Sequence, residues 1–268
     1  MAKTYSPHLE VATELQHAYD FFNKELFEGV LPGCMITLQR EKTSVGYFSS
    51  ERFGNKDGHF TDEIAMNPSY FAIYPILETL QTLVHEMAHL WQAHFGKPGR
   101  GRYHNEEWAQ RMEAIGLMPS HDGRPGGKRT GDHMRDYVIE GGRFIEAAKK
   151  LITAEFEISW HDRFPPAEAT LNASQLPSHQ LSSEMGLPAP TASTAPAVQA
   201  DLMVRANQAI AQHTSASTNK SNRVKYSCAC SPTLNFWGKA GIMALCQACN
   251  TLFKQPNSNG DQSLCFGC

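Results

Sequence analysis

The 268-residue sequence predicts an α+β domain over residues 1–163, a disordered linker over residues 164–222 and a small cysteine-rich module over residues 223–268. Three observations predict this division. In the first part, segments with apolar residues at helical spacing alternate with short strand-like segments. The composition then changes to Pro, Ala, Ser, Thr and Gln, with few aromatic residues. Finally, six of the seven cysteines lie between Cys228 and Cys268.

Composition excludes several classes of protein. The chain is 41% hydrophobic and 19% charged, as in an ordinary globular protein. It has no apolar run approaching the roughly eighteen residues that cross a bilayer, so no membrane partner is expected. The first residues lack the apolar core of a signal peptide, which predicts a cytoplasmic location. The net charge of −3 is uneven: residues 1–163 carry −5, whereas residues 223–268 carry +3.

The first elements are a helix and three strands. Residues 9–27 have apolar side chains at helical spacing, and Gly29, Pro32 and Gly33 end that helix. Three short segments rich in strand-forming residues follow, and we expect them to form a small antiparallel sheet. These segments are residues 35–39, 44–49 and 63–66.

Three further helices are expected. Residues 76–93 form a long segment that is apolar on most of its surface. A glycine-rich, basic loop (GKPGRGRY) separates it from a helix at residues 105–115, which Gly116 caps. A last helix covers residues 141–156, followed by a short extended piece at residues 157–160. A core of this size buries about 68–70% of its unfolded surface, which is enough to fold alone.

The prediction of a linker at residues 164–222 rests on the scarcity of aromatic residues there. A stretch with few aromatic residues cannot bury enough apolar surface to offset the entropy lost on ordering. Within it, residues 198–213 could form a transient helix.

The motif His85-Glu86-Met87-Ala88-His89 lies within the long apolar helix. Histidines four residues apart are rotated by only about 40° on a helix, so both imidazoles leave the same face and can hold one ion. Glu86 lies about 100° round from His85, where its carboxylate can take a proton from a zinc-bound water without ligating the metal. The alternative is a pair of helix histidines with ordinary hydrogen bonds, which would be costly to bury without a ligand.

A catalytic zinc normally has three protein ligands and one open position, so a third ligand is required. His94 lies on the same helix but is rotated far from the ligand face. His104 follows the glycine-rich loop, which lets the chain turn back. We therefore favour His104, although His94 remains the alternative. Phe95 stands six residues after His89, where the metzincin pattern has a histidine.

The tail carries a second candidate metal site. Two close pairs of cysteines are separated by fifteen residues, which suits four thiolates around a structural zinc. The preferred ligands are Cys228, Cys230, Cys246 and Cys249. Cys265 and Cys268 follow Cys249 at the same separation, so they could replace the first pair. We prefer the first set because NFWGKAGIMAL, which joins its pairs, offers strand-forming residues. A module this small needs such a metal to fold, so the sequence predicts one catalytic and at least one structural Zn²⁺.

The histidine segments resemble the SprT-like zinc metallopeptidases, a family that includes the eukaryotic protease Spartan. In that family an HExxH helix and a loop precede a third zinc histidine in a segment resembling H-G-P-E-F. Here HEMAHLWQ precedes His104, and Glu107 and Trp108 match the glutamate and the aromatic residue. Asn105 and Glu106 depart from the glycine and proline. The resemblance covers about residues 8–120 and resumes at the tail, where family members often have a zinc ribbon of the C-x-C and C-x-x-C type.

The resemblance implies a zincin-like fold and peptidase activity with Glu86 as the catalytic base. It also implies, from the best-known members, cleavage of proteins attached to DNA, with protein substrates and DNA as partners. The charge of the module fits contacts with phosphates, and two basic loops could line a DNA or substrate groove. These loops carry Lys97, Arg100 and Arg102, and Arg124, Lys128 and Arg129.

Two weaker predictions concern the substrate: Tyr103 could donate a hydrogen bond to the developing oxyanion, and residues 63–67 could be the edge strand that pairs with a substrate peptide. Two other functions stay open. The chain could be a non-enzymatic, zinc-binding nucleic-acid adaptor, or a narrow-specificity peptidase that cleaves one regulatory protein. Glu86 favours an enzyme, because a purely structural metal site gains nothing from a carboxylate beside an open position.

Overall fold

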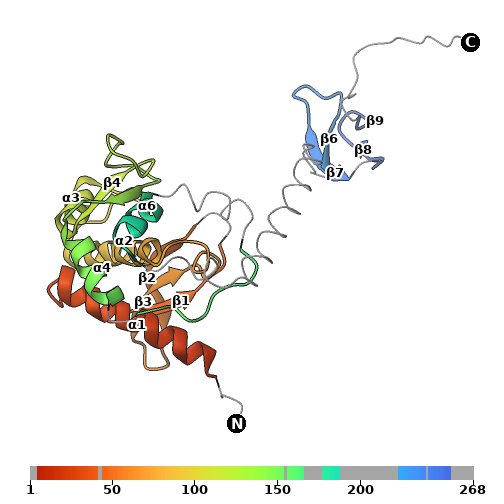
Figure 1. Cartoon of the computed structure of the whole chain (residues 1–268). Helices are drawn as coiled ribbons and strands as arrows, with labels where there is room; N and C mark the ends of the chain where they lie inside the picture. The colour runs from red at the N-terminus through yellow and green to blue at the C-terminus, as the bar shows by residue number, and fades with distance from the viewer. Residues whose placement is uncertain are drawn as a thin grey trace, which may run out of the picture. The chain divides into compact units, whose positions relative to one another are not determined.

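The computed structural model describes residues 5–41, 44–153, 156–165, 177–187, 223–239 and 241–254. The chain divides into two compact units, Met1–Ile210 and Ala211–Cys268 (Figure 1). The boundaries predicted at residues 163 and 222 stay a prediction. Among the helices of the described residues, none is both long and apolar enough to span a membrane.

The first unit mixes helices with small sheets, which confirms the α+β class. Its elements are α1 (Pro7–Leu26), β1 (Met35–Leu38), β2 (Gly46–Gly54), β3 (Phe60–Met66), α2 (Ile76–Phe95), α3 (Glu106–Ile115), β4 (Leu117–Ser120), β5 (Arg135–Val138), α4 (Arg143–Thr153) and α6 (Pro177–Glu184). Residues 157–160, expected to be extended, lie outside any strand.

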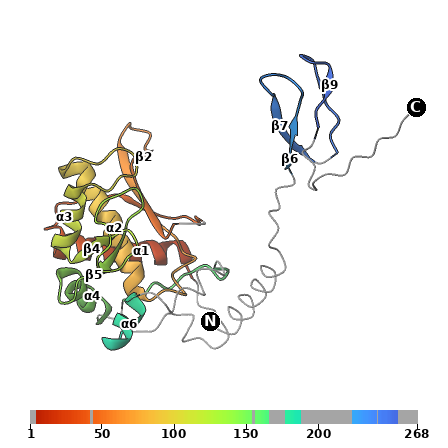
Figure 2. The same cartoon turned by 90° about the horizontal axis from the view of Figure 1, so that it is seen from above.

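Helix α2 occupies the centre of this unit. It packs against β2 and β3 on one side and against α3 on the other (Figure 2), and it also contacts α1 and α4. Leu77, Leu80, Val84, Met87 and Leu90 are each at most 1% exposed. A helix surrounded on several sides needs apolar residues around most of its circumference, which explains its composition.

The three-stranded sheet has the order β1-β3-β2, with β1 parallel and β2 antiparallel to β3. The sheet is therefore mixed, and the expectation of an antiparallel sheet is wrong. After β1 the chain crosses to the far side of the sheet, forms β2, and returns through a hairpin into β3. The expectation that residues 63–67 form an edge strand is also wrong, since β3 is the central strand and β2 lies at the edge, beside α2.

Helix α3 has clear signals at both ends. The Asn105 side chain accepts a hydrogen bond from the Trp108 backbone N–H, as an N-cap should. At the other end, Gly116 adopts a left-handed conformation with φ of 97°. A Cβ there would lie 2.7 Å from the backbone nitrogen of Phe144, so both backbone conformation and space require glycine. These caps fix where the chain turns on either side of the helix.

Three elements were not expected from the sequence. Strands β4 and β5 pair antiparallel, and a long glycine-rich loop joins them. Helix α6 lies within the segment predicted to be a disordered linker, and it contacts α2 and β5. Leu181, Met185 and Leu187 pack against the main core, which explains why this short stretch is helical despite its composition. The transient helix expected at residues 198–213 lies outside the described residues.

The second unit contains two small β-hairpins. Strands β6 (Arg223–Ser227) and β7 (Asn235–Lys239) pair antiparallel, as do β8 (Leu245–Cys246) and β9 (Thr251–Leu252). Tyr226 is 1% exposed and stacks on Phe236 at 4.9 Å between ring centroids, while Phe253 meets Phe236 edge-on at 5.0 Å. These three rings pack together, and Cys228 and Cys246 are buried in the same small unit.

Candidate metal centres

The structure brings His85, His89 and His104 together. The first two project from the middle of α2, and the third lies immediately before α3. One nitrogen atom from each ring lies within 4.8 Å of the others, and His89 Nε2 lies 3.0 Å from His104 Nε2. This is the convergence that the sequence predicted.

Hydrogen bonds on the far side of two rings prepare their nitrogen atoms for a metal. His85 Nδ1 lies 2.8 Å from Asp136 Oδ2, and His104 Nδ1 lies 3.1 Å from the Gly131 carbonyl oxygen. Both oxygen atoms are acceptors, so each Nδ1 carries a proton and each ring, when neutral, keeps an Nε2 lone pair. Burial opposes the charge on His85, but the hydrogen bond to Asp136 and the nearby carboxylates outweigh it and raise the pKa of His85. Burial lowers the pKa of His104 to about 4 and also lowers the pKa of His89 well below its ordinary value. Neutral imidazoles are the form that binds metal.

Asp136 is a site residue that the sequence did not reveal. It lies on β5 and is held by Gln81, whose Nε2 donates to Asp136 Oδ1 at 2.8 Å and to the Asp136 carbonyl oxygen at 3.0 Å. Gln81 lies one helical turn before His85 on α2. Gln81 gave no distinct signal, because the same helix carries a second glutamine, Gln92. The β4–β5 pair that presents Asp136 was itself not expected.

Aromatic rings surround the histidines. Trp108 is fully buried, and its ring centroid lies 4.9 Å from that of His85, 5.1 Å from His89 and 4.4 Å from His104. Phe48 of β2 stacks on His89 at 6.4 Å with an interplanar angle of 14°. Because Trp108 belongs to α3, the packing of α3 on α2 also sets the spacing of the three imidazoles.

Glu86 lies beside the histidines but outside their group. Glu86 is 6% exposed, and it lines the same cleft as Phe48 of β2. Burial raises the pKa of Glu86 to about 7, while His85 opposes this rise and Asp136 adds to it. Glu86 and the three histidines line one cleft of about 1650 Å³, which β2 and the loop before His104 also border. A carboxylate next to a ligand cluster in an accessible cleft is placed for proton transfer.

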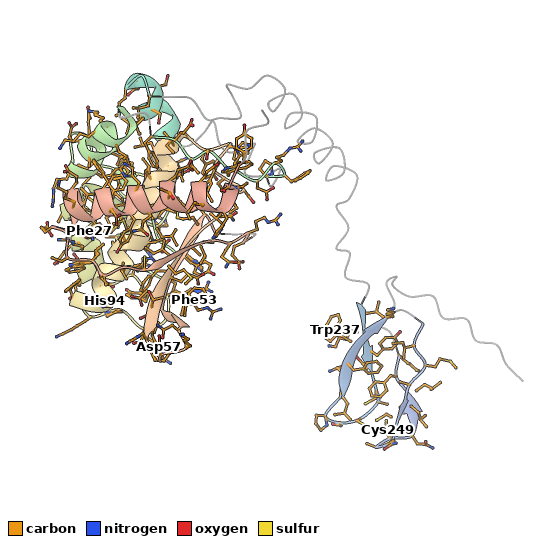
Figure 3. All side chains as sticks on the ribbon, turned by 90° about the horizontal axis from the view of Figure 1, so that it is seen from below. Phe27, Phe53, Asp57, His94, Trp237 and Cys249 are labelled. Carbon is orange, nitrogen blue, oxygen red and sulfur yellow. The ribbon has the colours of Figure 1, made fainter. Side chains whose placement is uncertain are left out.

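His94, the alternative third ligand, has a different partner. His94 lies at the C-terminal end of α2 (Figure 3), and its Nε2 is 2.6 Å from Oδ2 of Asp62 on β3. Asp62 Oδ1 in turn accepts a hydrogen bond from the Glu51 backbone N–H at 2.8 Å, where β2 is irregular and Glu51 has φ of 48°. His94 therefore joins α2 to the sheet and lies outside the histidine group.

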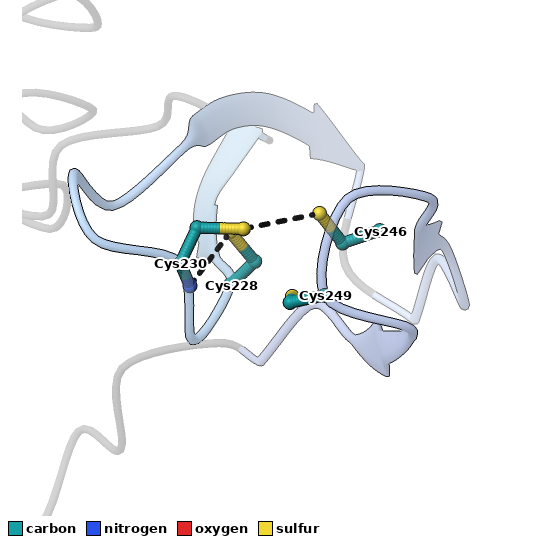
Figure 4. Close-up of side chains that lie close together, drawn as sticks. All are labelled: Cys228, Cys230, Cys246 and Cys249. Carbon is teal, nitrogen blue, oxygen red and sulfur yellow. Dashed lines mark hydrogen bonds between the residues drawn. The ribbon is translucent and has the colours of Figure 1, made fainter.

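The preferred cysteines also come together (Figure 4). The sulfur atoms of Cys228, Cys230, Cys246 and Cys249 lie within 4.8 Å of one another. Cys230 Sγ is 3.6 Å from Cys246 Sγ, and the Cys230 backbone N–H donates to Cys228 Sγ at 3.4 Å. A hydrogen bond from the Thr251 hydroxyl lowers the pKa of Cys249 to about 6. The competing set needs Cys265 and Cys268, which lie outside the described residues.

The basic loops contribute unequally to the cleft. Arg102 and Arg124 line it, as does Tyr103, which is 45% exposed. Arg129 instead forms ion pairs with Glu106 at 3.3 Å and Glu113 at 2.9 Å. Of the six predicted basic residues, Arg102 and Arg124 are those positioned to meet a ligand in the cleft.

Comparison with known proteins gives a consistent result. Residues 15–125 match the SprT-like family, a segment that contains Glu86 and all three histidines but ends before Asp136. A relative from Salmonella typhimurium, an uncharacterized protein in the mucB 3' region, is 56% identical over 59 residues, which is 22% of this chain and 80% of the relative. No solved structure matches. The chain belongs to the SprT-like family.

Proposed function

We propose that this chain is a zinc-dependent endopeptidase with a zincin-like catalytic domain. The observation that carries the proposal is the joint placement of three imidazoles and one carboxylate. One nitrogen atom from each of His85, His89 and His104 lies within 4.8 Å of the others. Glu86, on the helix that carries the first two, stays outside that group and lines the same cleft. SprT-like proteins are generally metallopeptidase-like, which supports the same kind of activity.

The donor set fits zinc. Three neutral nitrogen donors are typical of catalytic zinc sites, which keep a further position open, whereas structural sites are closed by four protein ligands. A bound zinc would supply a Lewis acid that polarises the scissile carbonyl group and lowers the pKa of a water molecule to about 7. Asp136 and Gly131 hold His85 and His104 in the tautomer that such a site needs.

Glu86 would act as the general base and then as the general acid. Its carboxylate would take the proton of the attacking water and deliver it to the leaving amine. Strand β2 lies beside this carboxylate, since a Cβ at Gly46 would be 3.6 Å from Glu86 Cγ and both residues line the cleft.

The edge strand β2 would bind the substrate. Tyr47, Phe48 and Ser49 line the cleft next to the histidines. An extended peptide that added to this edge would form main-chain hydrogen bonds, and its scissile bond would lie over the cluster. Tyr103, on the loop that also borders the cleft, would donate to the developing oxyanion.

The cysteine module would be a zinc ribbon that binds DNA. In the β6–β7 pair, Lys225 lies opposite Trp237, and Asn235 and Lys239 lie two residues to either side of Trp237. Residues two apart on a strand share a face, and Trp237 is 63% exposed on it (Figure 3). An exposed aromatic ring between lysines suits base stacking together with phosphate contacts. Proteins bound or crosslinked to DNA are accordingly the proposed substrates.

The decisive experiment compares the wild-type chain with Glu86→Gln. The substitution keeps the shape of the side chain and all metal ligands but removes the base. We expect unchanged zinc content and a loss of about 10²–10⁴-fold in the cleavage of unfolded and DNA-bound proteins. Equal cleavage by both chains would refute the peptidase proposal.

The same assays separate the alternative functions. If neither chain cleaves but the module binds DNA, the chain is an adaptor. If only the wild type cleaves, and it cleaves one regulatory protein without any effect of DNA, it is a narrow-specificity peptidase.

A further inference from the structure

His104 reaches the metal centre from a loop that has little packing of its own. From residue 97 to residue 103, every residue except the half-buried Gly99 is exposed. His104 itself is 8% exposed and forms a β-bridge with Gly131. Burial of loop side chains therefore cannot set the path by which the chain leaves α2 and returns to His104.

A compact hydrogen-bond network joins the two ends of this loop. At its start, the Lys97 backbone N–H donates to Glu107 Oε2 at 2.6 Å, and the Lys97 carbonyl oxygen accepts from Asn105 Nδ2 at 2.8 Å. Both backbone groups of Lys97 are thus bound by side chains that follow His104 within three residues. Forming these bonds closes the loop.

Gln92 ties the same network to α2. Its Nε2 donates to Asn105 Oδ1 at 2.7 Å and to Glu107 Oε2 at 2.8 Å. Gln92 is 3% exposed and lies three residues after His89. The network therefore connects the helix that carries two imidazoles with the segment that carries the third.

Gly96 fits this network, because a side chain at this position would displace the Glu107 carboxylate. Its φ of −125° and ψ of −156° are open to any residue. A Cβ at this position, however, would overlap Glu107 Oε2 and lie 2.9 Å from Glu107 Cδ. The chain leaves room at Gly96 for the Glu107 carboxylate.

We propose that Gln92, Asn105 and Glu107 are positioning residues that set His104 against His85 and His89. We call these three residues the loop clamp. The inference rests on the proposed function, since it assumes that the three histidines hold zinc. The clamp acts through His104 and touches neither the metal nor the substrate.

The test measures how tightly the full chain retains metal. Competition with a chelator measures the retention of zinc, and the absorption spectrum of bound cobalt reports which site is occupied. Nitrogen-ligated and thiolate-ligated cobalt absorb differently, so the cysteine module serves as an internal reference in each sample. We expect Glu107→Ala to weaken retention at the histidine centre by about 10–100-fold, as is typical when a residue supporting a ligand is lost. The thiolate signal should not change.

Two matched variants isolate the cause. Both network bonds to Glu107 end on Oε2, so the carbonyl oxygen of Glu107→Gln can accept them, and retention should stay within a few-fold of wild type. Glu106→Gln removes the neighbouring carboxylate, which pairs with Arg129 instead, and should have no effect. Gly96→Ala should reproduce the loss seen with Glu107→Ala while keeping every clamp side chain.

A double-mutant cycle with His104→Ala shows whether the clamp acts through that ligand. Adding Glu107→Ala to His104→Ala should not weaken the residual cobalt binding further. The proposal is wrong if the losses caused by Glu107→Ala and His104→Ala add, or if Glu107→Gln is as damaging as Glu107→Ala. It is also wrong if Glu107→Ala releases metal from the histidine and cysteine sites together. It is equally wrong if Glu107→Ala behaves like Glu106→Gln. A wild-type chain without metal at the histidines would instead refute the proposed function.

Discussion

The two candidate metal centres differ most in what surrounds them. Two of the histidines lie on α2 and the third just before α3. Helix α2 packs against four helices and a sheet, and the fully buried Trp108 contacts all three rings. The cysteines lie at strand ends and turns around a core of three aromatic rings. A centre built on a large core can form before the metal binds, whereas a module with so little core depends on its metal to fold.

The two centres also differ in the number and kind of their donor atoms. Four thiolates complete a tetrahedral shell and leave no position for a substrate. Three imidazoles leave a position open, and a carboxylate lies beside it. Under the proposed function, the histidine centre would carry the chemistry and the cysteine centre would fold a small module.

Removal of metal should have the largest effect. A chelator should unfold residues 223–254, because zinc contributes about 10–16 kcal/mol to such small sites, while the first domain stays folded. Hydrogen exchange of the full chain would show loss of protection in β6 and β7 but not in α2. Protection of β6 and β7 without metal would contradict the proposed dependence.

Loss of a ligand should separate the two candidate histidines. His104→Ala should weaken metal binding at the first centre so far that zinc is lost on washing, whereas His94→Ala should keep the metal because its partner is Asp62. Metal content per chain, after removal of loosely bound ions, measures both. The reverse result would assign the third ligand to His94.

Asp136→Asn should have a smaller effect. Asparagine keeps the shape of the side chain, but its amide nitrogen must face one of two donors, His85 Nδ1 or Gln81 Nε2. We expect about 10–100-fold weaker zinc retention at the histidine centre. Zinc retention at the cysteines should not change. Asp132→Asn, an exposed change on the preceding loop, is the control. Equal retention by the two variants would remove Asp136 from the site.

Trp237→Ala should have the smallest effect and should be confined to the module. A stacked base is worth about 1–3 kcal/mol, and the lower end applies on an exposed two-stranded face. Titration with single-stranded DNA across a salt series would measure the loss, and Leu234→Ala, another exposed apolar residue of the module, is the control. Equal binding by both variants would place the DNA surface elsewhere.

Local pattern predicted the parts of the molecule that depend on local geometry. The spacing of His85 and His89 on one helix determines that both imidazoles share a face. The start and end of α3 follow from Asn105 and Gly116, whose preferences act within a single turn. The cysteine spacing likewise indicated the four thiolates that the structure brings together.

Tertiary structure decided whatever depended on contacts between distant segments. The sequence left His94 and His104 as alternative third ligands. In the structure, Asp62 on β3 binds His94, whereas the loop that leads to α3 brings His104 to the other two histidines. Asp136 became visible only through the β4–β5 pair, which local pattern did not reveal. The mixed sheet, with β2 at its edge, depends on which strands meet across the core. Such pairings are set by packing on α2, and no window of neighbouring residues records them.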